Sequence, residues 1–156
     1  MKAITIWQPW ATLIMAGFKP FEFRGWPVPK SLVGQRIVIH AGARALKRTE
    51  VNGLLYQMSN GEFVGGLDVS AMRLLADIMQ GRRQLPTSAG LGTAVLGAPK
   101  KSFELWPDEF KGLSDSDRAE CSNWAWPLTD VQHFTPIVPA RGAQGFWNWP
   151  WSGGPQ

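Results

Sequence analysis

Hydrophobic and polar residues alternate along several short stretches of the chain, and this alternation predicts strands. In residues 2–7, Ile4 and Ile6 face one side of an extended chain, while Thr5 and Trp7 face the other. This pattern is typical of a half-buried strand. Further strands are expected at residues 21–24, 35–40, 91–97 and 123–134, followed by a last aromatic segment that ends at residue 151.

Apolar residues recur at helical spacing in three other stretches. One helix is expected to start at Trp10 and to end at Gly17, and longer helices are expected at residues 46–58 and 68–79. Helices inserted after the first strand and in the middle of the chain predict an α+β fold. We therefore expect a small, partly closed β-barrel of five to six strands flanked by helices.

Residues 104–121 interrupt these patterns with a polar, acidic stretch that contains Pro107 and Gly112. This composition predicts a surface excursion. The tail from about residue 152 is expected to fray. The chain has 156 residues, 44% of them hydrophobic, which suits a single domain over residues 1–156 with a real core.

Charge is concentrated in residues 17–24, where Lys19, Glu22 and Arg24 are interleaved with aromatic residues. If residues 21–24 are extended, Glu22 and Arg24 share one face, and Lys19 reaches it from the preceding turn. A cation, an anion and a cation on one face can read a polar ligand. The same three residues can also form an ordinary surface salt bridge, which contributes little to stability.

Composition narrows the possible partners and the compartment. The net charge is +4 and the isoelectric point is near 9.6, which favours an anionic partner. A single cysteine, Cys121, excludes an internal disulfide and a zinc site built on sulfur. No run of 18 apolar residues predicts a membrane span, and the N-terminus does not resemble a signal peptide. A cytoplasmic protein is therefore expected.

Tryptophan is unusually frequent, with nine tryptophans against one tyrosine. Tryptophans fill cores, and they also form platforms on which nucleobases stack. Trp147 and Trp149 are expected in the core. Trp7 and Trp26 are expected at a cleft.

Several segments, in order along nearly the whole chain, carry a family resemblance. They are the Ile-Thr-Ile-Trp-Gln-Pro-Trp run at 4–10, the Gly-x-Lys-x-x-Glu-x-Arg-x-Trp spacing at 17–26, the segments 34–41, 85–86, 91–97 and 124–131, and the Pro-x-Arg-Gly-x-Gln-Gly-Phe-Trp run at 139–147. Together they resemble the ASCH domain family of the PUA-like superfamily. The resemblance implies a β-barrel flanked by helices that recognises single-stranded RNA, or a modified nucleobase or nucleoside, in a cleft between barrel and helices.

The resemblance and the charge pattern together predict a set of binding residues. Phosphate contacts are expected from Lys19, Arg24, Arg44, Lys47 and Arg48, base-edge contacts from Glu22 and Gln8, and stacking from Trp7, Trp10 or Trp26. For Gln8, closing the turn before the first helix is an equal alternative.

An enzyme is the second hypothesis. Small relatives are amidohydrolases that use a lysine and a threonine three residues later, but here the residue three after Lys19 is Glu22, so the hydroxyl nucleophile is missing. A ribonuclease would draw its catalytic residues from Lys19, Glu22, His40, Lys47 and Ser122. No carboxylates have the spacing of a metal site, although a Mg²⁺ ion held partly by phosphate needs few protein ligands. A third hypothesis is a protein-interaction module with surface tryptophans as hot spots.

Overall fold

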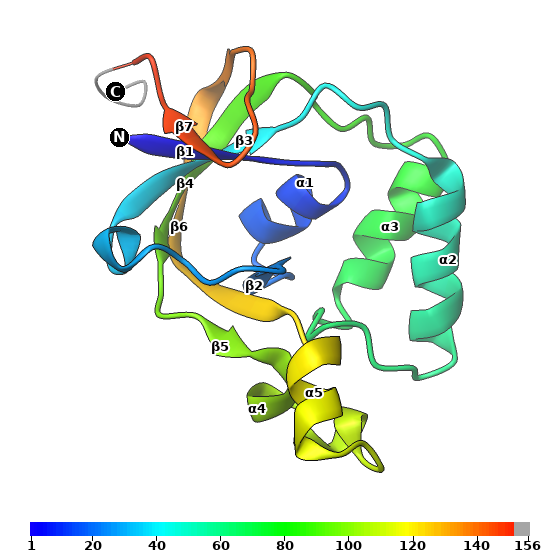
Figure 1. The fold of residues 1–156 in the computed structure, drawn as a ribbon. Helices are drawn as coiled ribbons and strands as arrows, with labels where there is room; N and C mark the ends of the chain where they lie inside the picture. The colour runs from blue at the N-terminus through cyan, green and yellow to red at the C-terminus, as the bar shows by residue number, and fades with distance from the viewer. Residues whose placement is uncertain (152–156) are drawn as a thin grey trace.

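A computed structural model describes residues 1–151, and it contains one strongly curved mixed sheet with helices on one side (Figure 1). The expected fraying from residue 152 lies outside the described residues. The strands are β1 Lys2–Ile6, β2 Phe21–Arg24, β3 Arg36–Ala41, β4 Ala89–Leu96, β5 Lys100–Lys101, β6 Trp124–Pro139 and β7 Phe146–Asn148. They follow the order β2-β6-β4-β3-β1-β7, and β5 pairs with β6. This half-barrel with helices confirms the predicted α+β fold.

The hydrophobic face of the sheet is buried as the alternation predicts. β1 and β3 run parallel, and every other strand pair is antiparallel. The main core contains Ile4 and Ile6 from β1, Ile37 and Ile39 from β3, and Trp126 from β6, all at most 2% exposed. Burial of such side chains contributes roughly 1.5–3 kcal/mol each, so these residues hold the half-barrel together.

The first helix, α1 Trp10–Met15, lies inside the curve of the sheet and is almost entirely buried. Its expected end at Gly17 agrees with a backbone φ of +80° there, which glycine adopts without strain. The chain then turns back, and the Lys19 amide donates to the Leu13 carbonyl at 3.2 Å. This turn delivers Lys19 to the start of β2.

Two further helices, α2 Arg48–Ser59 and α3 Ala71–Met79, pack against each other beside the barrel. Their buried face includes Val51, Leu54 and Leu75, and Leu13 of α1 completes this second core. Leu13 therefore connects the helical pair to the barrel.

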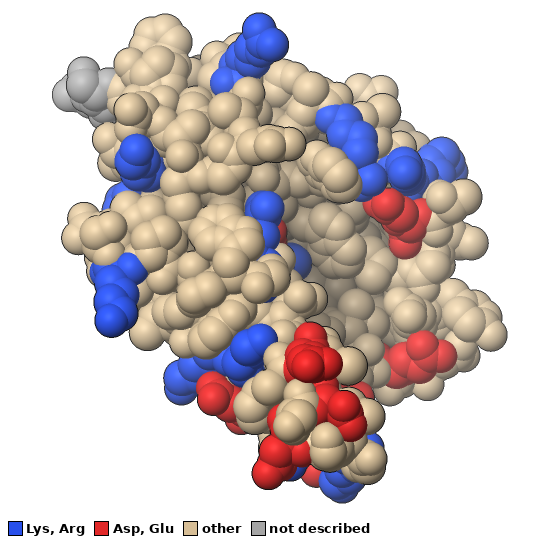
Figure 2. Space-filling model, viewed as in Figure 1, with Lys and Arg blue, Asp and Glu red and all other residues tan. Residues whose placement is uncertain are grey.

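Residues 102–121 form an appendage that we call the acidic lobe. It contains α4 Ser102–Leu105, the 3₁₀ turn η2 Pro107–Phe110 and α5 Asp115–Cys121. Six carboxylates and two cations lie in it, and Figure 2 shows the resulting cluster of acidic side chains at the lower edge of the molecule. A second 3₁₀ turn, η1 Lys30–Leu32, follows β2.

The last long strand differs from the expectation. It was expected to end at residue 134, but β6 continues to Pro139. The extension pairs with the start of β4, where Pro139 lies opposite Ala89 and Val138 opposite Gly90. The extension also contributes to a third core around Trp149. Glycine is needed at position 90, since a Cβ there would lie 2.4 Å from the Trp149 ring.

No helix within residues 1–151 is long and apolar enough to cross a membrane.

Candidate functional site

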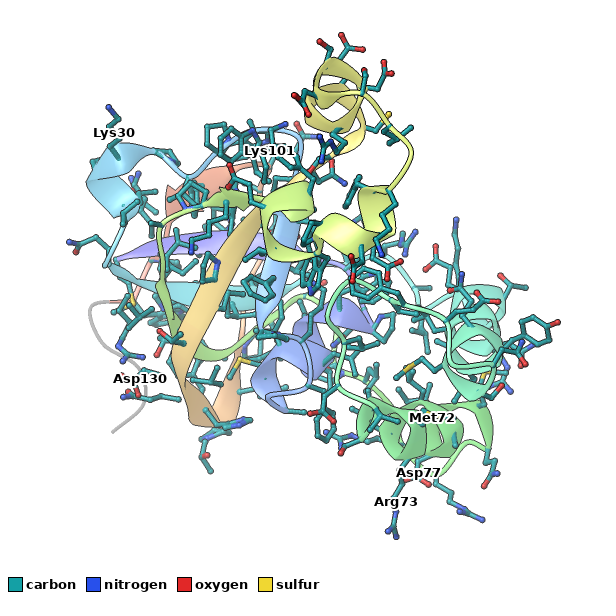
Figure 3. The ribbon with its side chains drawn as sticks, turned by 90° about the horizontal axis from the view of Figure 1, so that it is seen from below. Lys30, Met72, Arg73, Asp77, Lys101 and Asp130 are labelled. Carbon is teal, nitrogen blue, oxygen red and sulfur yellow. The ribbon has the colours of Figure 1, made fainter. Side chains whose placement is uncertain are left out.

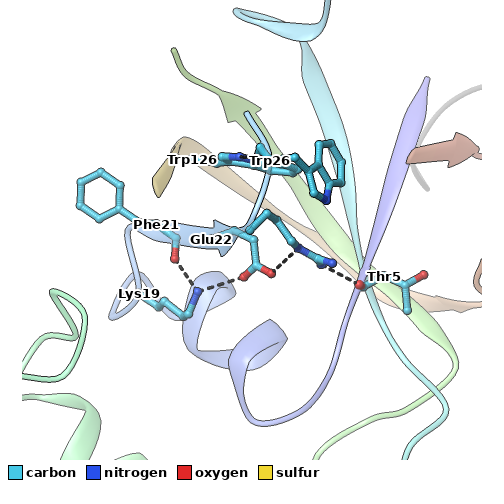
Figure 4. A network of polar contacts seen from close by, with 7 residues as sticks. Thr5, Lys19, Phe21, Glu22, Trp26 and Trp126 are labelled. Carbon is cyan, nitrogen blue, oxygen red and sulfur yellow. Dashed lines mark hydrogen bonds and ion pairs between the residues drawn. The ribbon is translucent and has the colours of Figure 1, made fainter. Parts of the chain in front are cut away.

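The charged residues of β2 and its preceding turn form one connected network, the trio Lys19, Glu22 and Arg24 (Figure 4). Lys19 Nζ lies 3.0 Å from Glu22 Oε2, and Arg24 Nε lies 3.0 Å from Glu22 Oε1. Lys19 also donates to the Phe21 carbonyl, and an Arg24 Nη donates to the Thr5 carbonyl at 3.2 Å. The carboxylate therefore bridges the two cations, and both cations are tied to the backbone.

Strand geometry explains why the trio converges. β2 pairs antiparallel with β6, with Glu22 opposite Trp126. Phe21 and Phe23 contact the Trp106 ring of the acidic lobe, at centroid distances of 5.5 and 5.9 Å. Because neighbouring strand residues point to opposite faces, Glu22 is directed to the other side.

Burial distinguishes the trio from a surface salt bridge. Lys19 is 7% exposed and Glu22 is 8% exposed. Burial lowers the pKa of the Lys19 ammonium from its ordinary value, although the charge and hydrogen bond of Glu22 oppose this effect. A buried carboxylate or ammonium is strongly destabilising unless an opposite charge is paired with it, so Glu22 and Lys19 hold each other in a fixed geometry.

The trio lies at two adjoining cavities. The inner one lies between β2 and the segment 64–67 that joins α2 to α3, and the outer one is bordered by β1, β2 and the loop 143–145. The inner cavity has a volume of about 290 Å³, and its walls include Lys19, Glu22, Val64 and Leu67. The outer cavity has a volume of about 600 Å³ and includes Arg24. The two cavities share Trp10, Glu22 and Phe23 in their walls. Figure 2 shows the molecular surface hollowed in this region, with basic side chains inside the hollow.

The three tryptophans predicted as candidates for stacking line these cavities. Trp10 is half-buried and borders both of them. Trp7 and Trp26 border the outer cavity and are 54% and 40% exposed. The Trp26 ring packs edge-on against Trp126 at a centroid distance of 4.6 Å, and the Arg44 guanidinium lies 4.0 Å from the Trp7 ring centroid.

Residues 4–137 match the ASCH domain. The chain belongs to the ASCH domain family. The crystal structure of an ASCH protein from Zymomonas mobilis has 17% identity, a TM-score of 0.44, and coverage of 88% of this chain and 72% of that one. A point mutant of the same Zymomonas mobilis protein has 20% identity, with the same TM-score and coverage. No curated protein matches the chain.

In this ASCH domain, Gln8 closes a turn. Its side chain is 1% exposed, donates to the Pro86 carbonyl at 2.8 Å and accepts from the Thr12 amide at 3.1 Å. Gln8 is absent from the walls of both cavities. The hydrogen bonds of the Gln8 side chain therefore match the alternative in which it closes the turn before α1.

The remaining cations predicted to bind phosphate lie apart from the trio, at the start of α2, and we call Arg44, Lys47 and Arg48 the α2 cations. Arg44 makes a two-pronged ion pair with Glu50, at 2.8 and 3.3 Å. Arg48 donates to the Met79 carbonyl at 2.6 Å. Lys47 is exposed. None of the three belongs to the walls of the inner or outer cavity.

Of the residues predicted to be catalytic, Lys19 and Glu22 lie together in the trio, whereas His40, Lys47 and Ser122 are outside the walls of its two cavities. His40 is fully buried, with Nε2 2.8 Å from the Ala140 carbonyl oxygen and Nδ1 3.3 Å from the Thr5 hydroxyl. Burial lowers its pKa from the ordinary value. Ser122 is also buried, accepts from the Phe103 amide and donates to the Asn123 carbonyl. Neither residue borders a cavity at the trio, because each is occupied in holding local structure.

The residues at the trio are poorly suited to binding Mg²⁺. Glu22 is the one carboxylate among the described residues that line the inner and outer cavities. Each of its oxygens accepts from Lys19 or Arg24, and these two cations would repel a Mg²⁺ ion placed at the carboxylate. Within residues 1–151, no three His, Cys, Asp or Glu side chains gather in a metal-binding arrangement.

Sequence reasoning missed part of the walls. Thr5 and the loop residues Ala143, Gln144 and Gly145 border the outer cavity, and Val64, Gly65 and Leu67 border the inner one. The glycines at 65, 142 and 145 mark turns in the sequence. These turns come close to β2 only in the folded chain. Their positions in the sequence therefore do not predict that they line the same cavities.

Proposed function

We propose that this ASCH domain binds a nucleobase of single-stranded RNA, or a modified nucleobase of the same kind, in the inner and outer cavities. The observation that carries this proposal is the trio, with Lys19 and Glu22 buried, which presents fixed hydrogen-bonding groups to cavities bordered by tryptophans. Nucleobases offer the two complementary features, a polar edge and a flat aromatic face.

The trio keeps hydrogen-bonding capacity after its internal contacts are made. A carboxylate has about four acceptor sites, an ammonium has three donors and a guanidinium has five. Glu22 uses two acceptor sites on Lys19 and Arg24, and Arg24 uses one donor on Glu22 and one on Thr5. Acceptors and donors therefore remain side by side. An exocyclic amine next to a ring nitrogen or carbonyl has the matching pattern.

The charge of the trio favours a base edge over a phosphate. Glu22 neutralises one of the two cations, so the trio carries a net charge of +1 in a partly desolvated place. A phosphate would repel the Glu22 carboxylate at close range, whereas a base is neutral. We therefore assign Lys19 and Arg24 to the base edge, in place of the phosphate contacts expected from the sequence.

Stacking supplies the second part of the proposed recognition. Trp10 borders both cavities, and the exposed face of Trp26 borders the outer one. Stacking of a base on an aromatic side chain is worth about 1–3 kcal/mol. The Trp26 ring packs edge-on against Trp126 and Phe146, at centroid distances of 4.6 and 6.0 Å, so little ordering is needed when a base stacks on it.

The geometry supports binding more than it supports the catalytic hypotheses. Amide hydrolysis through a side-chain nucleophile needs a hydroxyl or thiol near the substrate. The described residues that line the inner cavity carry neither, and the Thr5 hydroxyl of the outer cavity accepts from the Trp147 indole at 3.1 Å and lies 3.3 Å from His40 Nδ1. For a ribonuclease, the candidates His40 and Ser122 lie away from the trio with their polar atoms engaged.

Binding of short single-stranded RNA at a series of salt concentrations tests the proposal. We expect affinity to fall as salt rises, and Arg24→Gln and Lys19→Ala to weaken binding at least tenfold at every salt concentration. Lys30→Ala is the matched control, because Lys30 is exposed and points away from the barrel (Figure 3). The proposal is wrong if affinity ignores salt and neither variant of the trio differs from Lys30→Ala. Circular dichroism establishes that each variant is folded.

A further inference from the structure

A third cavity continues the hollow beyond the outer cavity. It has a volume of about 530 Å³, and we call it the Arg141 cavity after the cation in its wall. Its wall shares Thr5, Ala143 and Gln144 with that of the outer cavity. The outer cavity therefore adjoins both the inner cavity and the Arg141 cavity, and we call the three together the groove. A single base needs only part of such a groove.

Arg141 is the cation best placed for a phosphate along this groove. Its side chain is exposed, and it makes no ion pair or side-chain hydrogen bond with any residue in the range 1–151. Arg44 and Arg48, by contrast, are held by Glu50 and by the Met79 carbonyl. A guanidinium with all its donors available can bind phosphate oxygens in a two-pronged geometry.

The loop that carries Arg141 is fixed against the barrel. The Ala140 carbonyl contacts His40 Nε2 at 2.8 Å, and the Ala140 amide donates to the Ser88 carbonyl at 2.9 Å. A Cβ at Gly142 would lie 2.6 Å from the His40 ring, so the loop is pressed onto that ring. The buried His40 thus acts as a support for the wall, and Arg141 projects from a fixed backbone.

Charge differs between the two ends of the groove. Phe23 and Gly65 line both the inner cavity and a neighbouring pocket that reaches Trp106 and Glu109 of the acidic lobe. Six carboxylates against two cations make that lobe repulsive to a phosphodiester backbone. Figure 2 shows the acidic side chains gathered at the lobe end of the hollow. A strand with its base in the inner cavity therefore meets repulsion on the lobe side.

We propose that the ligand is a single strand of at least two nucleotides, with one base in the inner cavity and its backbone crossing the outer cavity to a phosphate site at Arg141. This inference rests on the proposed function and extends it from a base to an oligonucleotide. The base is read at the trio, and the next phosphate is held at the opposite end of the groove from the acidic lobe.

Calorimetric titration with unlabelled RNA of one, two, four and eight nucleotides tests the inference. We expect the tetranucleotide to bind at least tenfold more tightly than the mononucleotide. Arg141→Ala should weaken the tetranucleotide about five- to tenfold, reduce its salt slope by about one ion, and leave the mononucleotide unchanged. Arg73→Ala is the matched control, because Arg73 is exposed on α3 and points away from the molecule (Figure 3).

Two outcomes separate this inference from the proposed function. If Arg141→Ala and Arg73→Ala have equal effects at every length, or if the mononucleotide binds as tightly as the tetranucleotide, the Arg141 site is wrong while base binding at the trio stands. If no length binds, or if Arg24→Gln leaves all affinities unchanged, the proposed function itself fails.

Discussion

The trio of β2 and the α2 cations resemble each other in the sequence, but they differ in the folded molecule. In both places several charged residues lie within a few positions. In the trio, Lys19 and Glu22 are buried and Arg24 is half-buried, and the three are bridged to one another and form part of two cavity walls. The α2 cations lie outside those walls, and two of the three are held by Glu50 and by the end of α3. The two groups have a similar density of charge. They differ in the burial of their side chains and in their hydrogen-bond partners, and these differences make the trio the better candidate for binding a base.

The largest expected difference is in stability. Glu22→Gln leaves Lys19 and Arg24 without their carboxylate, and removing one partner of a buried pair costs about 3 kcal/mol. Glu50→Gln, the matched change at Arg44, should cost less than about 1 kcal/mol because that pair is more exposed. Urea unfolding of both variants measures the difference. Equal losses would show that the trio behaves as a surface salt bridge.

The next largest effect is expected from the stacking of a base on Trp26, beside the trio. Trp26→Ala should weaken binding of single-stranded RNA by about 1–3 kcal/mol, or roughly 5- to 150-fold, because its exposed face borders the outer cavity. Trp151→Ala is a control, since Trp151 is similarly exposed and outside the walls of both cavities. Fluorescence quenching of each variant by RNA gives the affinities. Matching affinities for the two variants would argue against a base at Trp26.

A smaller effect follows from the lowered pKa of Lys19. Between this lowered pKa of the folded chain and the ordinary pKa of 10.5, the unfolded chain holds a proton that the folded chain has released, so the free energy of unfolding should rise with pH over that interval. Lys19→Met removes this rise, whereas Lys47→Met reports the general effect of losing one positive charge. Urea midpoints measured between pH 7.5 and 10.5 test the prediction. A rise that persists unchanged in Lys19→Met would contradict it.

The smallest effect is expected at the α2 cations. Lys47→Ala should weaken RNA binding no more than about threefold, equally for all sequences, and only at low salt, because an exposed lysine contributes a screened, sequence-independent attraction. Anisotropy titrations with four homopolymeric octanucleotides at two salt concentrations measure this. A loss larger than that of Arg24→Gln would reverse the comparison between the two groups.

Alternation along the chain was sufficient to predict much of the fold. Ile4 and Ile6 face the core as the pattern indicates, and Gly17 ends the first helix region with a positive φ. The continuation of β6 through Pro136 was missed, because proline and polar residues weaken the strand pattern there. Pairing with β4 and packing near Trp149 decide this segment, and both depend on residues distant in the sequence.

The site was only partly predictable for a related reason. Lys19, Glu22 and Arg24 share one strand and its preceding turn, so local geometry brings them together. Gln8 and His40 carry polar groups in positions that suggest chemistry, yet tertiary partners occupy those groups. Whether a polar side chain faces a cavity or a backbone carbonyl depends on segments that no local pattern specifies. For the same reason, the sequence did not predict that the 143–145 loop borders the outer cavity.

Chemical-shift mapping with a single-stranded tetranucleotide tests the central claim most directly. On addition of the RNA, the account predicts that the side-chain Nε–H signals of Arg24 and the indole signals of Trp10 and Trp26 shift most, while those of Trp149 stay in place. Shifts confined to Arg44 and Arg48, with the Arg24 signal unmoved, would contradict the account.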